Sequence, residues 1–194
     1  DSDFVYDNTG REIKFTSCEQ FMMFCKANLF GDVLTADRIM STRDPKVQKA
    51  LGREVKNFDP ALWDEKKLKL VTIGNILKFS QSESLKKFLL STGDLVLVEA
   101  SPWDKIWGVG TSPKEDSTFD QSKWQGENLL GKALMAARER IKQIDNMTPT
   151  FNNVENKAYK TEDGTKWHSR ANATCIIVQV SEEVLVLKRG NALN

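Results

Sequence analysis

Residues 101–110 combine an acid, aromatic rings and glycines in one short loop, Ser-Pro-Trp-Asp-Lys-Ile-Trp-Gly-Val-Gly. Trp107 offers a flat face on which a ring can stack, and Asp104 adds a carboxylate nearby. Gly108 and Gly110 lack side chains, so the backbone can approach a phosphate or a sugar closely. The loop therefore predicts a site for a flat ring beside a sugar or phosphate. The alternative is a tryptophan that packs in the core, its usual place in a domain of this size.

Two side chains of opposite charge, Glu19 and Lys26, are seven residues apart in a segment with helical patterning. This spacing places both on nearly one face of a helix, so a carboxylate and an amine can line one cleft. Glu19 falls in the first turn, where the helix dipole favours its ionised form and suits it to stabilising a cation. Lys26 has apolar neighbours, and a partly desolvated amine has the lowered pKa that a lysine nucleophile needs. The alternative is a solvated surface pair without a chemical role.

Two further features predict contacts with an anion. The segment from Asn128 to Gly131 opens the last long helix, where free N–H groups and the dipole favour phosphate. The alternative there is an Asn cap with a glycine for close helix packing. A basic patch around an earlier helix is either a solvated face or a guide for a phosphate-bearing ligand or a nucleic-acid strand. The patch consists of Lys46, Lys49, Arg53 and Lys56.

The elements that must position these residues are mainly helices. Capping residues and apolar spacing predict a mainly α fold with a small β component, an α+β class. The continuous apolar run from Leu95 to Ala100 predicts a strand buried on both faces, and the tail predicts a β-hairpin. The expected helices cover residues 17–28, 33–40, 44–51, 59–79, 83–90 and 128–143, and the expected hairpin strands cover 173–180 and 184–187.

Composition sets further bounds. The chain has 194 residues, 40% apolar and 28% charged, which is enough for one good core and a small appendage. A net charge of +1 does not demand a nucleic-acid partner. The three cysteines lack CxxC spacing, which argues against a disulfide framework and a zinc site and favours a reducing compartment. We therefore expect an intracellular protein, cytoplasmic or nuclear, with no metal and no membrane contact, since no apolar run reaches transmembrane length.

Several motifs follow one another in a characteristic order. They are Ser17-Cys-Glu19-Gln20 with Met22, Met23, Lys26 and Ala27; Asp44-Pro45; Leu51-Gly52-Arg53; Asn57-Phe58-Asp59 with Trp63; Lys78-Phe79; Leu89-Leu90-x-Thr92-Gly93; Leu97-Val98-Glu99; Asp104-x-x-Trp107-Gly108-x-Gly110; and Trp124-x-Gly126-x-Asn128-x-Leu130-Gly131 with Leu134-Met135 and Arg138. Each motif alone is weak, but the ordered set is specific. Over about residues 2–143, the chain resembles the NADAR family, also called the YbiA-like family.

The resemblance implies a compact, mostly helical fold and an enzyme that hydrolyses N-glycosidic bonds without a cofactor. It implies Lys26 and Glu19 as the leading catalytic pair and Asp104 as a third, orienting or proton-transferring group. Lys26 would attack the anomeric carbon and hold the opened ribose as a Schiff base, while Glu19 would stabilise the oxocarbenium-like state. The implied substrate-binding residues are Arg53, Trp63, Trp107, Gly108, Gly110, Asn128, Leu130 and Gly131.

Two substrate classes are associated with the family: ribosylamino-pyrimidine intermediates of riboflavin synthesis, and ADP-ribose attached to guanine in nucleic acid. Three features are more similar to the eukaryotic and stand-alone branch of the family than to the riboflavin-associated branch: the Glu19-Gln20 pair, the Met22-Met23 pair and the segment from Leu51 to Asp59. We therefore favour removal of ADP-ribose, with an ADP-ribose-containing small molecule or an ADP-ribosylated nucleic acid as the partner. A module that binds ADP-ribose without turnover is the alternative from another class, although such a reader would not need both a glutamate and a lysine.

The chain divides at residue 146 into a catalytic domain, residues 1–146, and a linker with a β-hairpin, residues 147–194. Family members usually open with a strand that leads into a Ser-Asn-Phe-like sequence, and that strand is missing before Ser2-Asp3-Phe4. The tail from Glu183 to Leu193 resembles the missing strand, so one hypothesis is a circular permutation that completes the same domain. The other hypothesis is that the hairpin begins a truncated Nudix-like domain.

Overall fold

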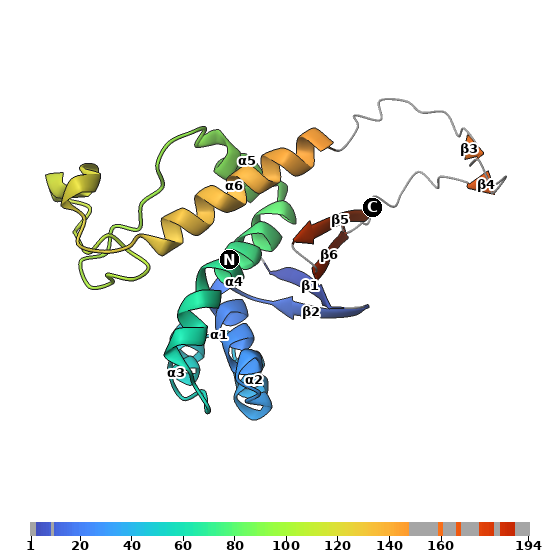
Figure 1. Cartoon of the computed structure of the whole chain (residues 1–194), viewed down its shortest axis with the longest axis horizontal. Helices are drawn as coiled ribbons and strands as arrows, with labels where there is room; N and C mark the ends of the chain where they lie inside the picture. The colour runs from blue at the N-terminus through green and yellow to red at the C-terminus, as the bar shows by residue number, and fades with distance from the viewer. Residues whose placement is uncertain are drawn as a thin grey trace.

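The computed structural model describes residues 3–8 and 10–147, together with four short strands further along the chain. The described residues are mostly helical, which confirms the predicted α+β class (Figure 1). None of the helices in these ranges is long and apolar enough to cross a membrane. The elements are β1 (Phe4–Asn8), β2 (Arg11–Phe15), α1 (Cys18–Leu29), α2 (Val33–Met40), α3 (Pro45–Arg53), α4 (Pro60–Ser80), α5 (Glu83–Ser91), the 3-10 helices η1 (Asp116–Phe119) and η2 (Gln121–Lys123), α6 (Leu129–Met147), β3 (Tyr159–Lys160), β4 (Lys166–Trp167), β5 (Cys175–Val180) and β6 (Glu183–Lys188).

Side-chain caps fix where the helices begin, as the sequence predicted. The Ser17 hydroxyl accepts a hydrogen bond from the Gln20 amide at 3.0 Å. The returning bond of this capping box comes from one residue further upstream, since the Thr16 amide donates to Gln20 Oε1 at 2.8 Å. Asp44 and Asp59 cap α3 and α4, each followed by a proline in the first helical turn. These caps set the register of α1, α3 and α4, the helices that carry the candidate site.

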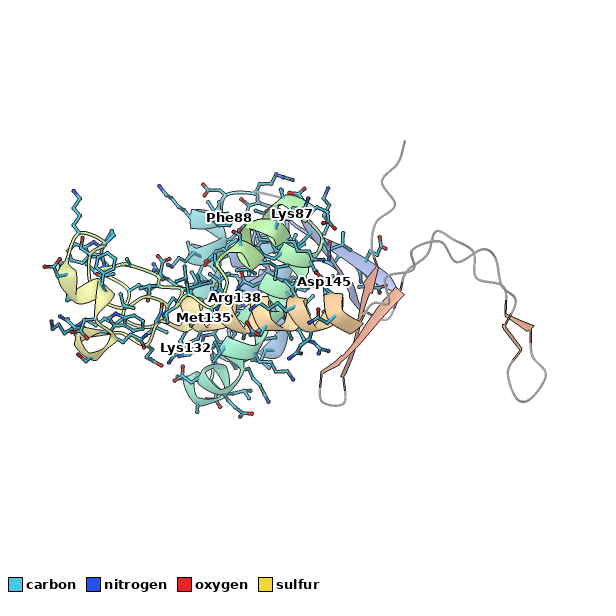
Figure 2. All side chains as sticks on the ribbon, turned by 90° about the horizontal axis from the view of Figure 1, so that it is seen from above. Lys87, Phe88, Lys132, Met135, Arg138 and Asp145 are labelled. Carbon is cyan, nitrogen blue, oxygen red and sulfur yellow. The ribbon has the colours of Figure 1, made fainter. Side chains whose placement is uncertain are left out.

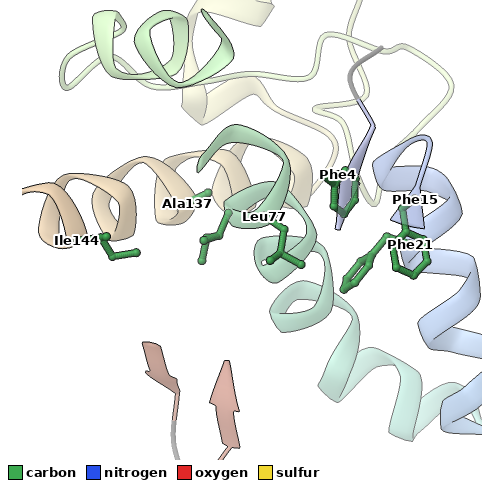
Figure 3. Packing of buried hydrophobic residues seen from close by; sticks show 7 residues of the cluster. Phe4, Phe15, Phe21, Leu77, Ala137 and Ile144 are labelled. Atoms are coloured by element: carbon green, nitrogen blue, oxygen red, sulfur yellow. The ribbon is translucent and has the colours of Figure 1, made fainter. Parts of the chain in front are cut away.

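An aromatic core joins the N-terminal hairpin to the long helices (Figure 3). β1 and β2 pair antiparallel, with Phe4 opposite Phe15, and both rings lie within 6 Å of the Phe21 ring of α1. Gly74 of α4 lets this helix approach α1, because a Cβ there would lie 2.8 Å from Phe21 Cδ1. The sequence analysis did not identify the β1–β2 hairpin. This hairpin contributes Phe4 and Phe15 to the core, and both are nearly fully buried.

Residues 95–100 differ from the prediction, because they form no strand. No described strand pairs with them, and Leu95 and Val96 are 69% and 47% exposed. Three backbone groups of this segment are bonded by side chains instead. Arg138 of α6, labelled in Figure 2, donates to the Leu95 carbonyl at 2.9 Å, and Asn128, just before α6, bonds the Leu97 carbonyl and the Glu99 amide. The Leu95 amide and the Glu99 carbonyl are bonded by loop backbone. The expected two-face burial is therefore wrong for this segment, which is bonded along one edge by side chains rather than by neighbouring strands.

The predicted C-terminal hairpin is confirmed. β5 and β6 pair antiparallel, from Cys175 opposite Lys188 to Val180 opposite Glu183. In Figure 1 this hairpin lies beside the β1–β2 hairpin, and β6 contacts β1. The two hairpins remain separate two-stranded sheets. The division of the chain at residue 146 and the two hypotheses for residues 147–194 stay predictions.

Candidate active site

Glu19 lies in the first turn of α1 and is half-buried. Its Oε1 atom is buried and has no hydrogen-bond partner among the described residues. Burial raises the pKa of the Glu19 carboxyl; the positive charges of Lys49 and Arg53 oppose this shift, and the negative charge of Asp104 adds to it. Desolvation of the carboxylate is the largest cause, and the resulting direction is opposite to the one expected from the helix dipole. Glu19 is therefore better suited to donating a proton than the sequence indicated.

Lys26 lies two turns further along α1, with its amine facing two aromatic rings. Its Nζ atom donates a hydrogen bond to the Gly52 carbonyl at 2.7 Å. The same atom lies 4.2 Å from the centre of the Phe58 ring and 5.7 Å from that of Trp63. Burial lowers the pKa of the Lys26 amine, as expected for a partly desolvated lysine. The amine forms no ion pair within the described ranges, so no carboxylate there holds it in the charged form.

Both catalytic candidates interact with helix α3. The carboxyl end of α3 supplies the Gly52 carbonyl to Lys26, and its exposed face supplies the Lys49 and Arg53 charges that act on Glu19. The Cα atoms of Glu19 and Lys26 are about 10.5 Å apart along the helix axis, and lysine side chains on a helix lean towards its N-terminus. The seven-residue spacing therefore presents both groups to one helix, as predicted.

Gly52 of α3 lies directly against the Met23 side chain of α1. A Cβ atom at Gly52 would overlap Met23 Sδ and lie 2.8 Å from Met23 Cγ, so a side chain at residue 52 would force Met23 to shift. Met23 belongs to an apolar cluster that joins α1, α2 and α3. That cluster consists of Met23, Ala27, Phe30, Ala36, Ile39, Leu51 and Val55. Gly52 thus lets α3, which supplies the carbonyl to Lys26, pack against α1 with Met23 in this position.

The loop of residues 101–110 reaches the same site through Asp104. Asp104 Oδ1 accepts hydrogen bonds from the amides of Ile106 at 3.0 Å and Trp107 at 2.8 Å. These bonds fix the carboxylate within its own turn, close enough for its charge to raise the pKa of Glu19. Trp107 is half-buried next to it. The structure therefore brings Asp104 to Glu19 but holds one of its oxygens in a structural role.

The glycines and Asn128 of the predicted pocket bring backbone segments together. A Cβ at Gly108 would lie 2.8 Å from the Glu99 carbonyl, and a Cβ at Gly131 would lie 2.1 Å from the Leu97 carbonyl. Asn128 is buried, adopts a φ of 53° and bonds the Glu99 amide at 3.0 Å and the Leu97 carbonyl at 2.9 Å. The close approach expected at these positions is thus made to the protein's own backbone.

The first amides of α6 are also used within the fold. The Leu129 and Leu130 amides donate to the carbonyls of Ile106 and Trp107, both at 3.1 Å. They are therefore not free for the anion that the sequence placed at this helix end. A ligand contact by Gly110, Leu130 or the residues that hold these backbone segments together (Gly108, Asn128 and Gly131) stays a prediction. Of the other predicted binding residues, Trp63 faces the Lys26 amine, and the charge of Arg53 acts on the Glu19 carboxyl.

Sequence reasoning missed two contributors to this site, Phe58 and the Gly52 carbonyl, and it named Lys49 as part of the basic patch but not as a charge that acts on Glu19. The signal for Phe58 was present, since Asn57-Phe58-Asp59 places an aromatic ring just before a capped helix. Asn57 adopts the left-handed region with a φ of 56°, and this turn directs the Phe58 ring to Lys26. Phe30 then supports Phe58 edge-on, with ring centres 5.2 Å apart.

The order and geometry of these motifs agree with comparisons to known proteins. The NADAR domain profile matches residues 2–142 of the chain. The chain belongs to the NADAR family. This NADAR domain is 47% identical over 138 residues to N-glycosidase R617 of Acanthamoeba polyphaga mimivirus, an alignment that covers 71% of the chain and 81% of that protein.

Two further relatives bear on fold and activity. The Arabidopsis thaliana protein named "Riboflavin biosynthesis protein PYRR, chloroplastic" is 34% identical over 106 residues, which cover 53% of this NADAR domain chain but 16% of that protein. The NMR structure of the Escherichia coli protein YbiA matches with a TM-score of 0.59 at 23% identity, covering 77% of this chain and 80% of that chain, and this likeness concerns the fold. The names of the relatives support a glycosidase activity in the NADAR family.

Proposed function

We propose that this NADAR domain hydrolyses the N-glycosidic bond of an ADP-ribosyl adduct, above all ADP-ribose on guanine in nucleic acid. Lys26 is the nucleophile and Glu19 is the proton donor. The observation that carries this proposal is the pairing of two groups on one helix: an amine that has no carboxylate partner, and a half-buried carboxyl with one oxygen that has no hydrogen-bond partner, both among the described residues. The displaced pKa values of the two groups are typical of a site for acid–base chemistry.

The reaction needs these two groups in sequence. Protonated Glu19 gives its proton to the leaving base while the bond between the base and the anomeric carbon breaks, and the new carboxylate stabilises the oxocarbenium-like ribose. The free amine of Lys26 bonds to the anomeric carbon. After this attack the nitrogen carries two protons and a positive charge, and it passes one proton to the ring oxygen as the bond between that oxygen and the carbon breaks, which yields a hydroxyl group and a protonated Schiff base. Water gives a proton to the Glu19 carboxylate and adds to the same carbon. Glu19 passes this proton to the nitrogen as the C–N bond breaks and takes up the proton of the new hydroxyl group, which releases ADP-ribose as an aldehyde and restores the free amine and the protonated carboxyl.

Charges around the site support an anionic substrate. Lys49 and Arg53 lie on the exposed face of α3 beside Glu19, where they can meet the diphosphate of ADP-ribose. Trp63 borders Lys26, and Trp107 follows the Asp104 turn. Either ring offers a surface for the leaving base or the adenine.

A second candidate substrate is a ribosylamino-pyrimidine intermediate of riboflavin synthesis. It is favoured by the riboflavin biosynthesis names among the relatives, although the chain spans 16% of the plant protein against 81% of the viral N-glycosidase. A direct test incubates the full chain with an ADP-ribosylated guanine oligonucleotide, free ADP-ribose adducts and the pyrimidine intermediate. Release of ADP-ribose from the oligonucleotide supports the proposal, and release from the pyrimidine intermediate alone assigns the second candidate. Tight binding without release of either product identifies a binding module and refutes both hydrolase assignments.

Lys26→Ala and Glu19→Gln should each abolish release, because they remove the nucleophile and the proton donor. Lys69→Ala is the matched control, since Lys69 is an exposed lysine on α4 outside the site. Full activity in Lys26→Ala would overturn the lysine mechanism while leaving the substrate assignment open to the same assay.

A further inference from the structure

The surroundings of the Lys26 amine are built to hold a positive charge without a counter-ion. A carbonyl oxygen, Gly52 O, accepts one N–H at 2.7 Å. An aromatic face, that of Phe58, lies 4.2 Å from the same nitrogen, well inside the range of a cation–π contact. Within the described part of the chain the amine has no carboxylate partner. A carboxylate would hold the amine as ammonium, whereas a ring face stabilises a cation more weakly and leaves deprotonation within reach.

The proposed Schiff base carries its positive charge on this same nitrogen. An ammonium group has three N–H bonds, while the protonated Schiff base of a lysine has one. Among the described residues the site offers that nitrogen one carbonyl acceptor and aromatic rings, of which Phe58 is the nearer, and this set matches the intermediate, with its single N–H, better than the ammonium. The contacts seen in the free protein thus fit the intermediate.

We propose that Phe58 is a further catalytic residue, whose ring face stabilises the charged nitrogen of the Lys26 Schiff base while the Gly52 carbonyl orients its single N–H. This inference rests on the proposed function of Lys26. In forming the intermediate, the bond from Nζ to the anomeric carbon is made, the bond from that carbon to the ring oxygen breaks, and one proton of Nζ moves to the oxygen. In its hydrolysis, a water oxygen bonds to the carbon and loses both its protons, one to Nζ through Glu19 and one to Glu19 itself, and the electron pair of the C–N bond returns to Nζ.

The ring is held for this purpose and still has an open side. The left-handed turn at Asn57 precedes Phe58, the cap of α4 at Asp59 follows it, and Phe30 supports it edge-on. Phe58 nevertheless remains 41% exposed, so the pocket is not closed over the amine. Trp63 lies further from the amine, at 5.7 Å, and is the weaker of the two aromatic contacts.

A fluorination series at residue 58 tests this inference with almost no change in shape. The full chain is made with phenylalanine, 4-fluoro-, 3,5-difluoro- or 3,4,5-trifluorophenylalanine at this position, because each fluorine withdraws charge from the ring face. We expect the single-turnover rate of ADP-ribose release and the yield of borohydride-trapped adduct to fall stepwise, by about 2- to 30-fold over the whole series. The same series at Phe88, which is 70% exposed on α5, is the matched control and should leave both values unchanged.

A flat or rising series at residue 58 overturns the role of Phe58, as does an equal fall at Phe88. Lys26→Ala, assayed in parallel, separates the two proposals. If Lys26→Ala is inactive and the residue 58 series is flat, the inference about Phe58 fails alone. If Lys26→Ala is fully active, the proposed function of Lys26 fails and this inference fails with it.

Discussion

Asn128 clamps the chain through its two hydrogen bonds to the backbone of Leu97 and Glu99. This clamp allows a quantitative prediction that tells whether Asn128 positions the backbone or binds the ligand. Asn128→Gly keeps a backbone that tolerates the φ of 53° but leaves the Glu99 amide and the Leu97 carbonyl without their partners. Each unsatisfied buried group costs about 1–3 kcal/mol, and water will reach these half-buried groups, so we expect a loss of about 2–4 kcal/mol in the free energy of unfolding. Asn128→Ala should lose about 1–2 kcal/mol more, because alanine is strained in the left-handed region.

Urea unfolding of both variants, followed by circular dichroism, measures these differences, and the midpoint of thermal unfolding should fall by about 5–15 °C for Asn128→Gly. The KM of the folded variants should change little. The clamp interpretation is refuted if Asn128→Gly unfolds within about 0.5 kcal/mol of wild type while its KM rises at least tenfold. That result would return Asn128 to the ligand pocket, where the sequence analysis placed it.

Three further predictions concern titratable groups. The acidic limb of the pH profile of kcat/KM should move to higher pH in Lys49→Ala and to lower pH in Asp104→Asn, because these residues respectively lower and raise the pKa of Glu19; unmoved limbs would show that Glu19 does not titrate in catalysis. Glu19→Gln should raise the thermal midpoint at pH 7. The pKa of the Glu19 carboxyl is higher in the folded than in the unfolded protein, so its contribution to stability is lost as the pH rises through the folded pKa. The advantage of Glu19→Gln over wild type should therefore disappear below pH 4.5. A thermal midpoint of the variant below that of wild type at pH 7 would contradict the burial argument. Burial raises the pKa of Cys18 to about 11 and of Cys25 to about 12. In a variant that lacks Cys175, iodoacetamide should therefore label neither thiol at pH 8 until urea unfolds the chain.

Local capping chemistry was the part of this fold that the sequence predicted well. Ser17, Asp44 and Asp59 each act on amides two or three residues away, so their roles follow from short spacing alone. The segment from Leu95 to Ala100 was mispredicted because an apolar run carries no information about its partners. Three of its backbone groups are bonded by side chains from residues 128 and 138, which are far away in sequence.

The chemistry of the candidate site was only partly predictable for the same reason. The seven-residue spacing of Glu19 and Lys26 on one helix is a local property, and the structure presents both to α3. The direction of the Glu19 pKa shift depends on burial by other elements, and the helix dipole alone gave the opposite sign. The contact between Phe58 and Lys26 spans α1 and the turn before α4, so no periodicity within either segment reveals it.

The central claim is that Lys26 forms a covalent bond to the ribose during turnover. Its most direct test is borohydride reduction of the full chain during turnover of an ADP-ribosylated guanine oligonucleotide, followed by mass spectrometry of the digested protein. We predict one added ADP-ribose-derived mass on the peptide that contains Lys26, lost in Lys26→Ala and retained in Lys69→Ala. Turnover without any adduct, or an adduct on another lysine, would contradict the account.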